Sequence, residues 1–151
     1  MLDVNSYEGE ILLVEDNPND AELVIRALKR TGLRAAVSHV EDGVQAIEFL
    51  LGTGAFAARA GAPLPKLVML DCKLPKLTGV EVLRQIRAEP RLAQVITVML
   101  TSSKEERDIA DAYRHGVNSY VVKPVEFEEF VDTVGRIGQY WLRFNQAGPQ
   151  L

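Results

Sequence analysis

Residues 11–17 read Ile-Leu-Leu-Val-Glu-Asp-Asn, a run of four aliphatic side chains that ends in two acids and an amide. Similar short aliphatic runs occupy residues 67–70, 95–100 and 120–122, and a weaker one covers residues 35–40. Continuous runs with little alternation of apolar and polar residues are typical of strands buried on both faces of a parallel sheet. We therefore expect five parallel strands.

Helical patterns separate these runs. Apolar residues recur every three or four positions in five segments, which cover residues 24–31, 46–51, 80–87, 109–113 and 127–141. Strands that alternate with helices predict a doubly wound α/β fold. Residues 52–65 are rich in Ala, Gly and Pro, so they predict an irregular surface loop.

Composition narrows the function classes. The 151 residues are 47% hydrophobic and 25% charged, which suits one globular domain and excludes a disordered chain. Seven acids precede the first basic residue, Arg26, which argues against a secretory signal. No apolar run reaches the roughly 18 residues that span a bilayer. With a net charge of −4, we expect a cytoplasmic protein that uses neither nucleic acid nor a membrane as its partner.

The residues that follow four of the aliphatic runs carry polar and charged groups. They are Glu15 with Asp16, Asp71, Thr101 with Ser102, and Lys123. Ligands of open parallel sheets bind beyond the carboxyl ends of the strands. We therefore expect these side chains to converge in space, although they are far apart in the sequence.

The three acids predict a metal ion and a reactive carboxylate. Two unit charges about 4 Å apart cost roughly 4 kcal/mol at an effective dielectric of about 20, so the cluster needs a cation. A ligand set of oxygens alone favours Mg²⁺ over zinc. A carboxylate can also act as a nucleophile and form an acyl phosphate. Asp71 is the best candidate because it ends the central strand, and Lys123 and Thr101 are placed to stabilise a phosphoryl group.

Each of these residues also has an ordinary structural interpretation. Asp16 alone suits a helix cap or a turn, and Thr101 with Ser102 suits the cap of the helix that follows. Lys123 alone suits an exposed surface, and Cys72 suits apolar packing better than redox chemistry. The joint occurrence of such residues at four strand ends favours a functional site over four separate structural roles.

The motifs together resemble the receiver domain of two-component response regulators. The matching stretches are residues 11–17, residues 67–71 with Leu74, Pro75 and Gly79, residues 98–102, and residues 120–124. The resemblance implies a flavodoxin-like five-stranded sheet in the order 2-1-3-4-5. It also implies a receiver domain over residues 8–144, a short tail over residues 145–151 and no output domain.

The same resemblance implies a role for each site residue. Asp71 accepts a phosphoryl group from a sensor histidine kinase, which makes the protein a phosphoacceptor switch rather than an enzyme. Asp16 binds Mg²⁺ directly and Glu15 binds it through water. The backbone carbonyl of Lys73 is a further ligand, as is Asp71 itself.

The resemblance further implies how the phosphoryl group acts. Lys123 contacts it, and Thr101 and Tyr120 rearrange together as a switch that signals through protein contacts. The bond between Lys123 and Pro124 is expected to be cis.

A closer similarity points to a kinase partner. Residues 38–46, Phe49 with Leu50, and the loop through residues 56–65 resemble single-domain regulators paired with bacterial phytochromes. The chain departs from the common receiver pattern at Cys72 and Lys73, which follow the expected phosphoacceptor. A phytochrome-type histidine kinase is therefore the expected partner. The resemblance assigns no role to Cys72 and Lys73.

Three aromatic residues crowd the end of the last helical pattern. Tyr140, Trp141 and Phe144 exceed what one helix face usually hides, and exposed aromatic patches mark interfaces. We expect a homodimer built partly on them. The alternative is a helix that simply packs on its own sheet.

Two other functions share parts of the pattern. A flavodoxin-like flavin carrier holds a flavin phosphate after its first strand, where Glu15 and Asp16 would repel it without a metal. An aspartyl-phosphate phosphatase needs a second acid two residues after its nucleophile, where this chain has Lys73.

Overall fold

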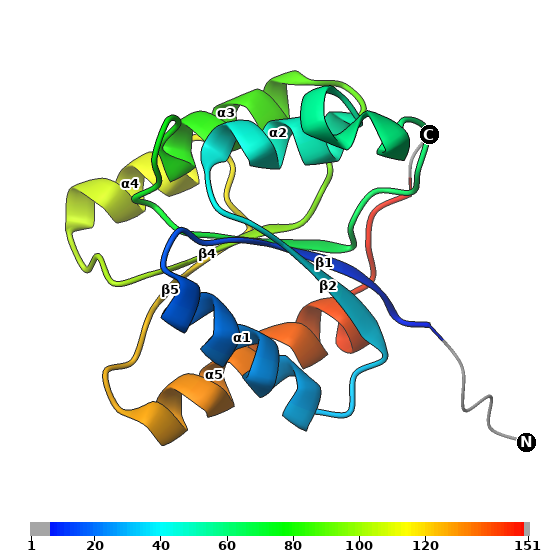
Figure 1. Ribbon diagram of the computed structural model, residues 1–151. Coiled ribbons are helices and arrows are strands. Elements are labelled where there is room, and N and C mark those ends of the chain that lie inside the picture. Colours follow the sequence, from blue (N-terminus) through cyan, green and yellow to red (C-terminus); the bar gives the residue numbers. More distant parts are fainter. Residues whose placement is uncertain (1–6, 150–151) are drawn as a thin grey trace, which may run out of the picture.

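The five aliphatic runs form a parallel sheet in the order β2-β1-β3-β4-β5, as expected (Figure 1). The computed structural model describes residues 7–149. The strands are β1 Gly9–Val14, β2 Ala35–Val40, β3 Leu67–Leu70, β4 Thr97–Thr101 and β5 Ser119–Val122. All four residues of β3 are buried, because this central strand is covered on both faces.

Five helices cover the two faces of the sheet. They are α1 Pro18–Arg30, α2 Gly43–Leu51, α3 Gly79–Ala88, α4 Glu106–Arg114 and α5 Phe127–Gln139. Figure 1 shows α2, α3 and α4 on one face and α1 with α5 on the other. Each face has its own apolar cluster: Leu83 of α3 packs in the first, and Val24 of α1 packs in the second. The sheet therefore lies between two cores, which fixes the positions of its strand ends.

The caps of the helices decide between two interpretations of the strand-end residues. Asn17, not Asp16, caps α1, because its side chain accepts hydrogen bonds from the backbone of the first turn. Thr101 lies within β4, and the N-cap of α4 is Glu105. Asp16 and Thr101 are thus not used as helix caps, which leaves their side chains available for another role.

The segment over residues 52–65 differs from the expected irregular loop. It contains a 3₁₀ turn, Gly54–Arg59, which places Phe56 edge-on against Phe49 with ring centroids 5.3 Å apart. The guanidinium of Arg59 lies 3.6 Å from the centre of the Phe49 ring on α2. These contacts, rather than local propensity, hold the turn.

The chain after α5 continues as a single π-helical turn, Tyr140–Phe144. Leu142 is buried, and its carbonyl accepts a hydrogen bond of 2.9 Å from Nζ of Lys66. Arg143 pairs with Glu8 at 2.6 Å, which ties this turn to the start of β1. The predicted tail lies along residues 145–149, and its last two residues fall outside the described part of the chain. Across residues 7–149, none of the helices has the length and apolar character needed to cross a bilayer.

Candidate functional site

The parallel strands bring the predicted side chains to one edge of the sheet. Val14 at the end of β1 lies opposite Leu70 of β3, so Glu15 and Asp71 both follow directly. Thr101 ends β4 opposite Val122 of β5, and Lys123 comes next. The topology thus gathers the four strand-end groups that the sequence analysis singled out.

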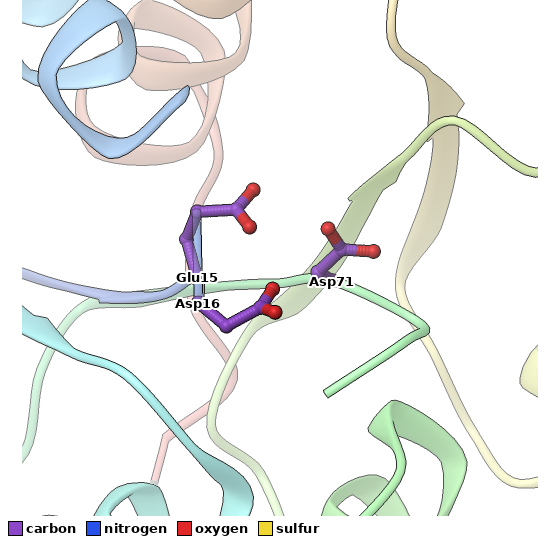
Figure 2. Close-up of side chains that lie close together, drawn as sticks. All are labelled: Glu15, Asp16 and Asp71. Atoms are coloured by element: carbon purple, nitrogen blue, oxygen red, sulfur yellow. The ribbon is translucent and has the colours of Figure 1, made fainter. Parts of the chain in front are cut away.

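Three acids form a cluster at this edge. Glu15, Asp16 and Asp71 each offer a carboxylate oxygen, and these oxygens lie within 4.8 Å of one another. Glu15 is 3% exposed, Asp71 is partly buried and Asp16 is exposed. Figure 2 shows the carboxyl group of Asp16 pointing toward Asp71. The cluster is therefore closed on the side of Glu15 and open to solvent on the side of Asp16.

Lys123 compensates much of this negative charge. Its Nζ lies 2.6 Å from Oε1 of Glu15, 3.0 Å from Oδ2 of Asp20 and 3.2 Å from Oδ2 of Asp71. The side chain of Lys123 is 8% exposed. Burial alone lowers its pKa, but the hydrogen bond to Glu15 and the charge of Asp71 outweigh burial, so the pKa is raised. Lys123 is thus a permanent cation beside Asp71.

Asp20 is the contact of Lys123 that the sequence analysis missed. It lies in the first turn of α1, three residues after the cap Asn17. A helix that starts next to the first strand end places its first turn beside the site. The sequence signal for this contact was an acidic residue in the first turn of the helix that follows the first strand.

The pKa of the buried acid Glu15 is raised above its ordinary value. Burial raises its pKa, and the hydrogen bond from Lys123 offsets only part of that rise. Its other oxygen accepts a hydrogen bond of 3.2 Å from the backbone amide of Asn17. Lys123 is therefore the cation that favours the charged form of Glu15.

The acid cluster fits a hard divalent cation. Its donors are carboxylate oxygens, one of them solvent-exposed, which matches the preference of Mg²⁺ for a few carboxylates together with water. Lys73 is exposed beside the cluster, and its backbone amide donates to Oδ1 of Asp71 at 3.3 Å. The predicted coordination by the Lys73 carbonyl stays a prediction.

An open cavity of about 350 Å³ lies against Asp71. Its wall consists of Asp71, Lys73, Thr101, Ser102, Ser103, Lys104 and Glu105. The lining joins the end of β3 to the loop between β4 and α4. The cavity gives a small anionic group access to the Asp71 carboxylate from solvent.

The loop that carries Asp71 depends on a close backbone approach. A Cβ added to Gly79 would lie 2.3 Å from the backbone oxygen of Asp71. The amide of Gly79 also donates to the carbonyl of Cys72 at 2.8 Å. Glycine at the start of α3 therefore lets the helix pack directly onto this loop.

The side chains of Thr101 and Tyr120 both form hydrogen bonds with the backbone of Ser103. Thr101 is 1% exposed, and its hydroxyl accepts a hydrogen bond of 3.4 Å from the amide of Ser103. The Tyr120 hydroxyl donates to the carbonyl of Ser103 at 3.0 Å. A movement of Thr101 is thus linked to Tyr120 through one loop residue.

Cys72 packs as a small apolar residue, in agreement with its structural interpretation. Its sulfur lies 3.4 Å from the sulfur of Met99 and 3.6 Å from the Tyr120 hydroxyl. Burial raises the pKa of the thiol, which keeps it protonated and unreactive at neutral pH.

The expected cis bond between Lys123 and Pro124 is wrong for this structure. Every described peptide bond is trans. The next residue, Val125, is 98% exposed, so the chain leaves the site into open solvent. The trans isomer is the more stable form of bonds that precede proline.

The sequence has clear relatives. The response regulator receiver domain family matches residues 11–135. FilR2 of Methanothrix harundinacea, a probable methanogenesis regulatory protein, is 43% identical over 92% of this chain and 88% of its own length. Response regulator Rcp1 of Synechocystis is 34% identical over 94% of this chain and 95% of its own length.

Solved structures share the fold over nearly the whole chain. The phosphorylated cyanobacterial phytochrome response regulator RcpA superposes with a TM-score of 0.87 at 33% identity, covering 95% of this chain and 100% of RcpA. The Mn²⁺-bound form of Rcp1 superposes with a TM-score of 0.85 at 33% identity, covering 93% of this chain and 99% of Rcp1.

Proposed function

The chain belongs to the response regulator receiver family, and we propose that it accepts a phosphoryl group on Asp71 from a sensor histidine kinase. The observation that carries this proposal is the position of Asp71. Asp71 directly follows the central strand β3, its carboxylate lies 3.2 Å from Nζ of Lys123, and it lines a solvent-accessible cavity. The nucleophilic carboxylate of Asp71 therefore has a fixed cation beside it and an open approach for the phosphoryl donor.

The chemistry is an exchange of one phosphorus bond for another. An oxygen of Asp71 attacks the phosphorus of a phosphohistidine, and a phosphorus–oxygen bond forms. The phosphorus–nitrogen bond breaks, and its electron pair remains on the imidazole of the kinase. Lys123 donates to a phosphoryl oxygen during transfer, and the Thr101 hydroxyl adds a second donor once its side chain turns toward Asp71. These groups stabilise the charge that the transition state spreads over the phosphoryl oxygens.

Three acids would hold the Mg²⁺ that this reaction uses. We expect Asp16 and Asp71 to bind it directly, Glu15 to bind it through water, and the carbonyl of Lys73 to be a further ligand; the closeness of the three carboxylates supports this assignment. When bound, the ion neutralises charge on the phosphoryl oxygens. The Mn²⁺-bound form of the relative Rcp1 supports a divalent ion in a fold of this kind.

Phosphorylation would act on the loop between β4 and α4. The new phosphoryl oxygens attract the Thr101 hydroxyl, and Ser103 and Tyr120 then follow through their hydrogen bonds. The face built by α4, β5 and α5 changes shape as a result. A shift from 1:99 to 99:1 requires about 5.5 kcal/mol of preference for the active state, which a few charge-assisted hydrogen bonds supply.

The kinase that we propose is of the phytochrome type. The phytochrome response regulator RcpA shares the fold at 33% identity and covers 95% of this chain, which supports the choice. We assign the receiver to residues 8–144 and the protein to the cytoplasm. Its output would pass through contacts with other proteins.

We also propose a homodimer that uses the turn after α5. Tyr140 is 50% exposed and Phe144 is 71% exposed, whereas Trp141 packs partly against the core. The rings of Tyr140 and Trp141 meet edge to face, with their centroids 4.9 Å apart. Exposed aromatic residues beside one another are typical of interfaces.

Phosphorylation of the purified protein tests the function. We expect acetyl phosphate with Mg²⁺, or a phosphorylated phytochrome-type kinase, to label the wild-type chain. Asp71→Asn removes the nucleophile and abolishes the label. The control Asp132→Asn changes an exposed acid on α5 and keeps the label. A label that persists in Asp71→Asn would exclude Asp71 as the acceptor.

A further inference from the structure

Lys123 has one carboxylate partner that the proposed reaction does not explain. Oδ2 of Asp20 lies 3.0 Å from Nζ of Lys123, although the two residues are 103 positions apart in the sequence. Asp20 belongs to α1, whereas Lys123 follows β5. This contact joins a helix on one face of the sheet to the edge where the acids meet.

Every N–H group of the Lys123 ammonium has a carboxylate acceptor in this arrangement. It has three N–H donors, and three carboxylates accept from it: Glu15, Asp20 and Asp71. Once two donors of a tetrahedral ammonium are held, the direction of the third is determined. Glu15 and Asp20 together therefore aim the third N–H at Asp71.

The same two contacts can persist through phosphoryl transfer. Formation of the acyl phosphate removes the charge of the Asp71 carboxylate and places phosphoryl oxygens beside it. The third N–H can pass from Asp71 to one of these oxygens without release of Glu15 or Asp20. A lysine held in this way needs little reorganisation during the reaction, which is the condition for effective electrostatic stabilisation.

The backbone of Asp20 is fixed well enough for this role. Its amide donates to Oδ1 of the helix cap Asn17 at 3.2 Å, which holds the first turn of α1. The Asp20 side chain is 36% exposed, whereas that of Lys123 is 8% exposed. The contact thus lies at the rim, where the carboxylate anchors a buried ammonium.

We propose that Asp20 is a positioning residue for phosphoryl transfer to Asp71, acting through Lys123. This inference rests on the proposed function. It assigns to the first turn of α1 a part in the reaction itself, in addition to any effect on the stability of the helix.

Two other roles for Asp20 predict different behaviour. A purely electrostatic role would repel an anionic donor, so that removal of the charge would speed the reaction. A purely structural role would change the stability of α1 and leave the rate of the folded protein unchanged.

The test is the rate of phosphorylation by acetyl phosphate over a range of concentrations at saturating Mg²⁺. In this reaction the phosphorus–oxygen bond to the acetyl group breaks, acetate leaves with the electron pair, and the bond to Asp71 forms. The variants are Asp20→Ala, which has no acceptor, and Asp20→Asn, which keeps a neutral one. The control Glu22→Gln removes an exposed charge from the same helix.

We expect Asp20→Ala to lower the maximal rate roughly tenfold, the effect of one charge-assisted hydrogen bond. Asp20→Asn is expected to give an intermediate rate, and Glu22→Gln a normal one. The donor concentration at half-maximal rate should stay the same or fall. A maximal rate in Asp20→Ala that equals or exceeds that of the wild type overturns the inference. Absence of labelling in the wild type would instead refute the proposed function, so the two failures are distinguishable.

Discussion

Nζ of Lys123 lies 3.2 Å from Oδ2 of Asp71, although the two residues are 52 positions apart in the sequence. The pair joins the central strand β3 to the edge strand β5 across the end of β4. The same ammonium also contacts Glu15, which is 3% exposed. One cation therefore supports a group of acids that would otherwise repel one another.

The stability of the protein should depend on this lysine. Lys123→Met leaves the buried Glu15 without its partner, and loss of one member of a buried pair costs about 3 kcal/mol or more. Urea unfolding would measure the loss, and added Mg²⁺ should restore part of it by supplying another cation. Lys29→Met, at an exposed position of α1, is the control. Equal unfolding midpoints for the two variants would contradict the expectation.

Most of this site followed from strand ends alone. Glu15, Asp16 and Asp71 were predicted to converge because the carboxyl ends of parallel strands share one edge, and the structure brings them together. Asp20 escaped notice because its contact with Lys123 crosses from a helix to a strand end. No local pattern reports such a contact.

The structure also differs from the sequence-based expectations in the loop after α2 and at Pro124. The 3₁₀ turn in the loop after α2 depends on Phe56 meeting Phe49, a tertiary contact that overrides the flexible composition of the loop. The cis isomer at Pro124 was implied by resemblance alone, and every described peptide bond is trans. Periodicity predicts elements and their edges, whereas side-chain contacts decide the details between them.

Gly79 should be intolerant of a side chain. A Cβ there would lie 2.3 Å from the backbone oxygen of Asp71, so Gly79→Ala forces α3 and the Asp71 loop apart. We expect a loss of about 2 kcal/mol in stability, typical of overpacking, and slower phosphorylation. Gly148→Ala is the matched control, because its nearest neighbour would lie 3.9 Å away. Calorimetry and labelling with acetyl phosphate measure the two effects.

The Tyr120 hydroxyl should hold the loop between β4 and α4. Tyr120→Phe removes its hydrogen bond of 3.0 Å to the Ser103 carbonyl, a loss of about 1 kcal/mol. We expect faster hydrogen exchange of the amides in residues 102–106, measured by mass spectrometry. Tyr113→Phe, at an exposed position of α4, should leave exchange unchanged. Unaltered exchange in Tyr120→Phe would mean that other contacts order the loop.

The ion pair of Glu8 and Arg143 should add stability that depends on pH. The hydrogen bond from Arg143 holds the pKa of Glu8 below its ordinary value of 4.5. A carboxyl whose pKa is lowered by folding stabilises the protein above that ordinary value, and the contribution disappears as the pH falls through the lowered pKa.

Glu8→Gln tests this contribution. The pair is partly exposed, so the variant should lose less than about 1 kcal/mol at neutral pH. Urea unfolding of the two proteins should give the same free energy once the pH is well below the lowered pKa. A difference that persists in acid would show that Glu8 acts through packing rather than charge.

The aromatic turn after α5 should control self-association. Phe144 is 71% exposed, so Phe144→Ser should cost the folded monomer little. If the turn forms the dimer interface, loss of a central aromatic anchor weakens association at least about tenfold. Sedimentation velocity over a range of protein concentrations measures the change. The control Val125→Ser alters a fully exposed apolar residue before α5 and should leave the dimer intact. A wild-type chain that stays monomeric at high micromolar concentration would exclude the dimer, and weakening by Val125→Ser instead would move the interface to the opposite end of α5.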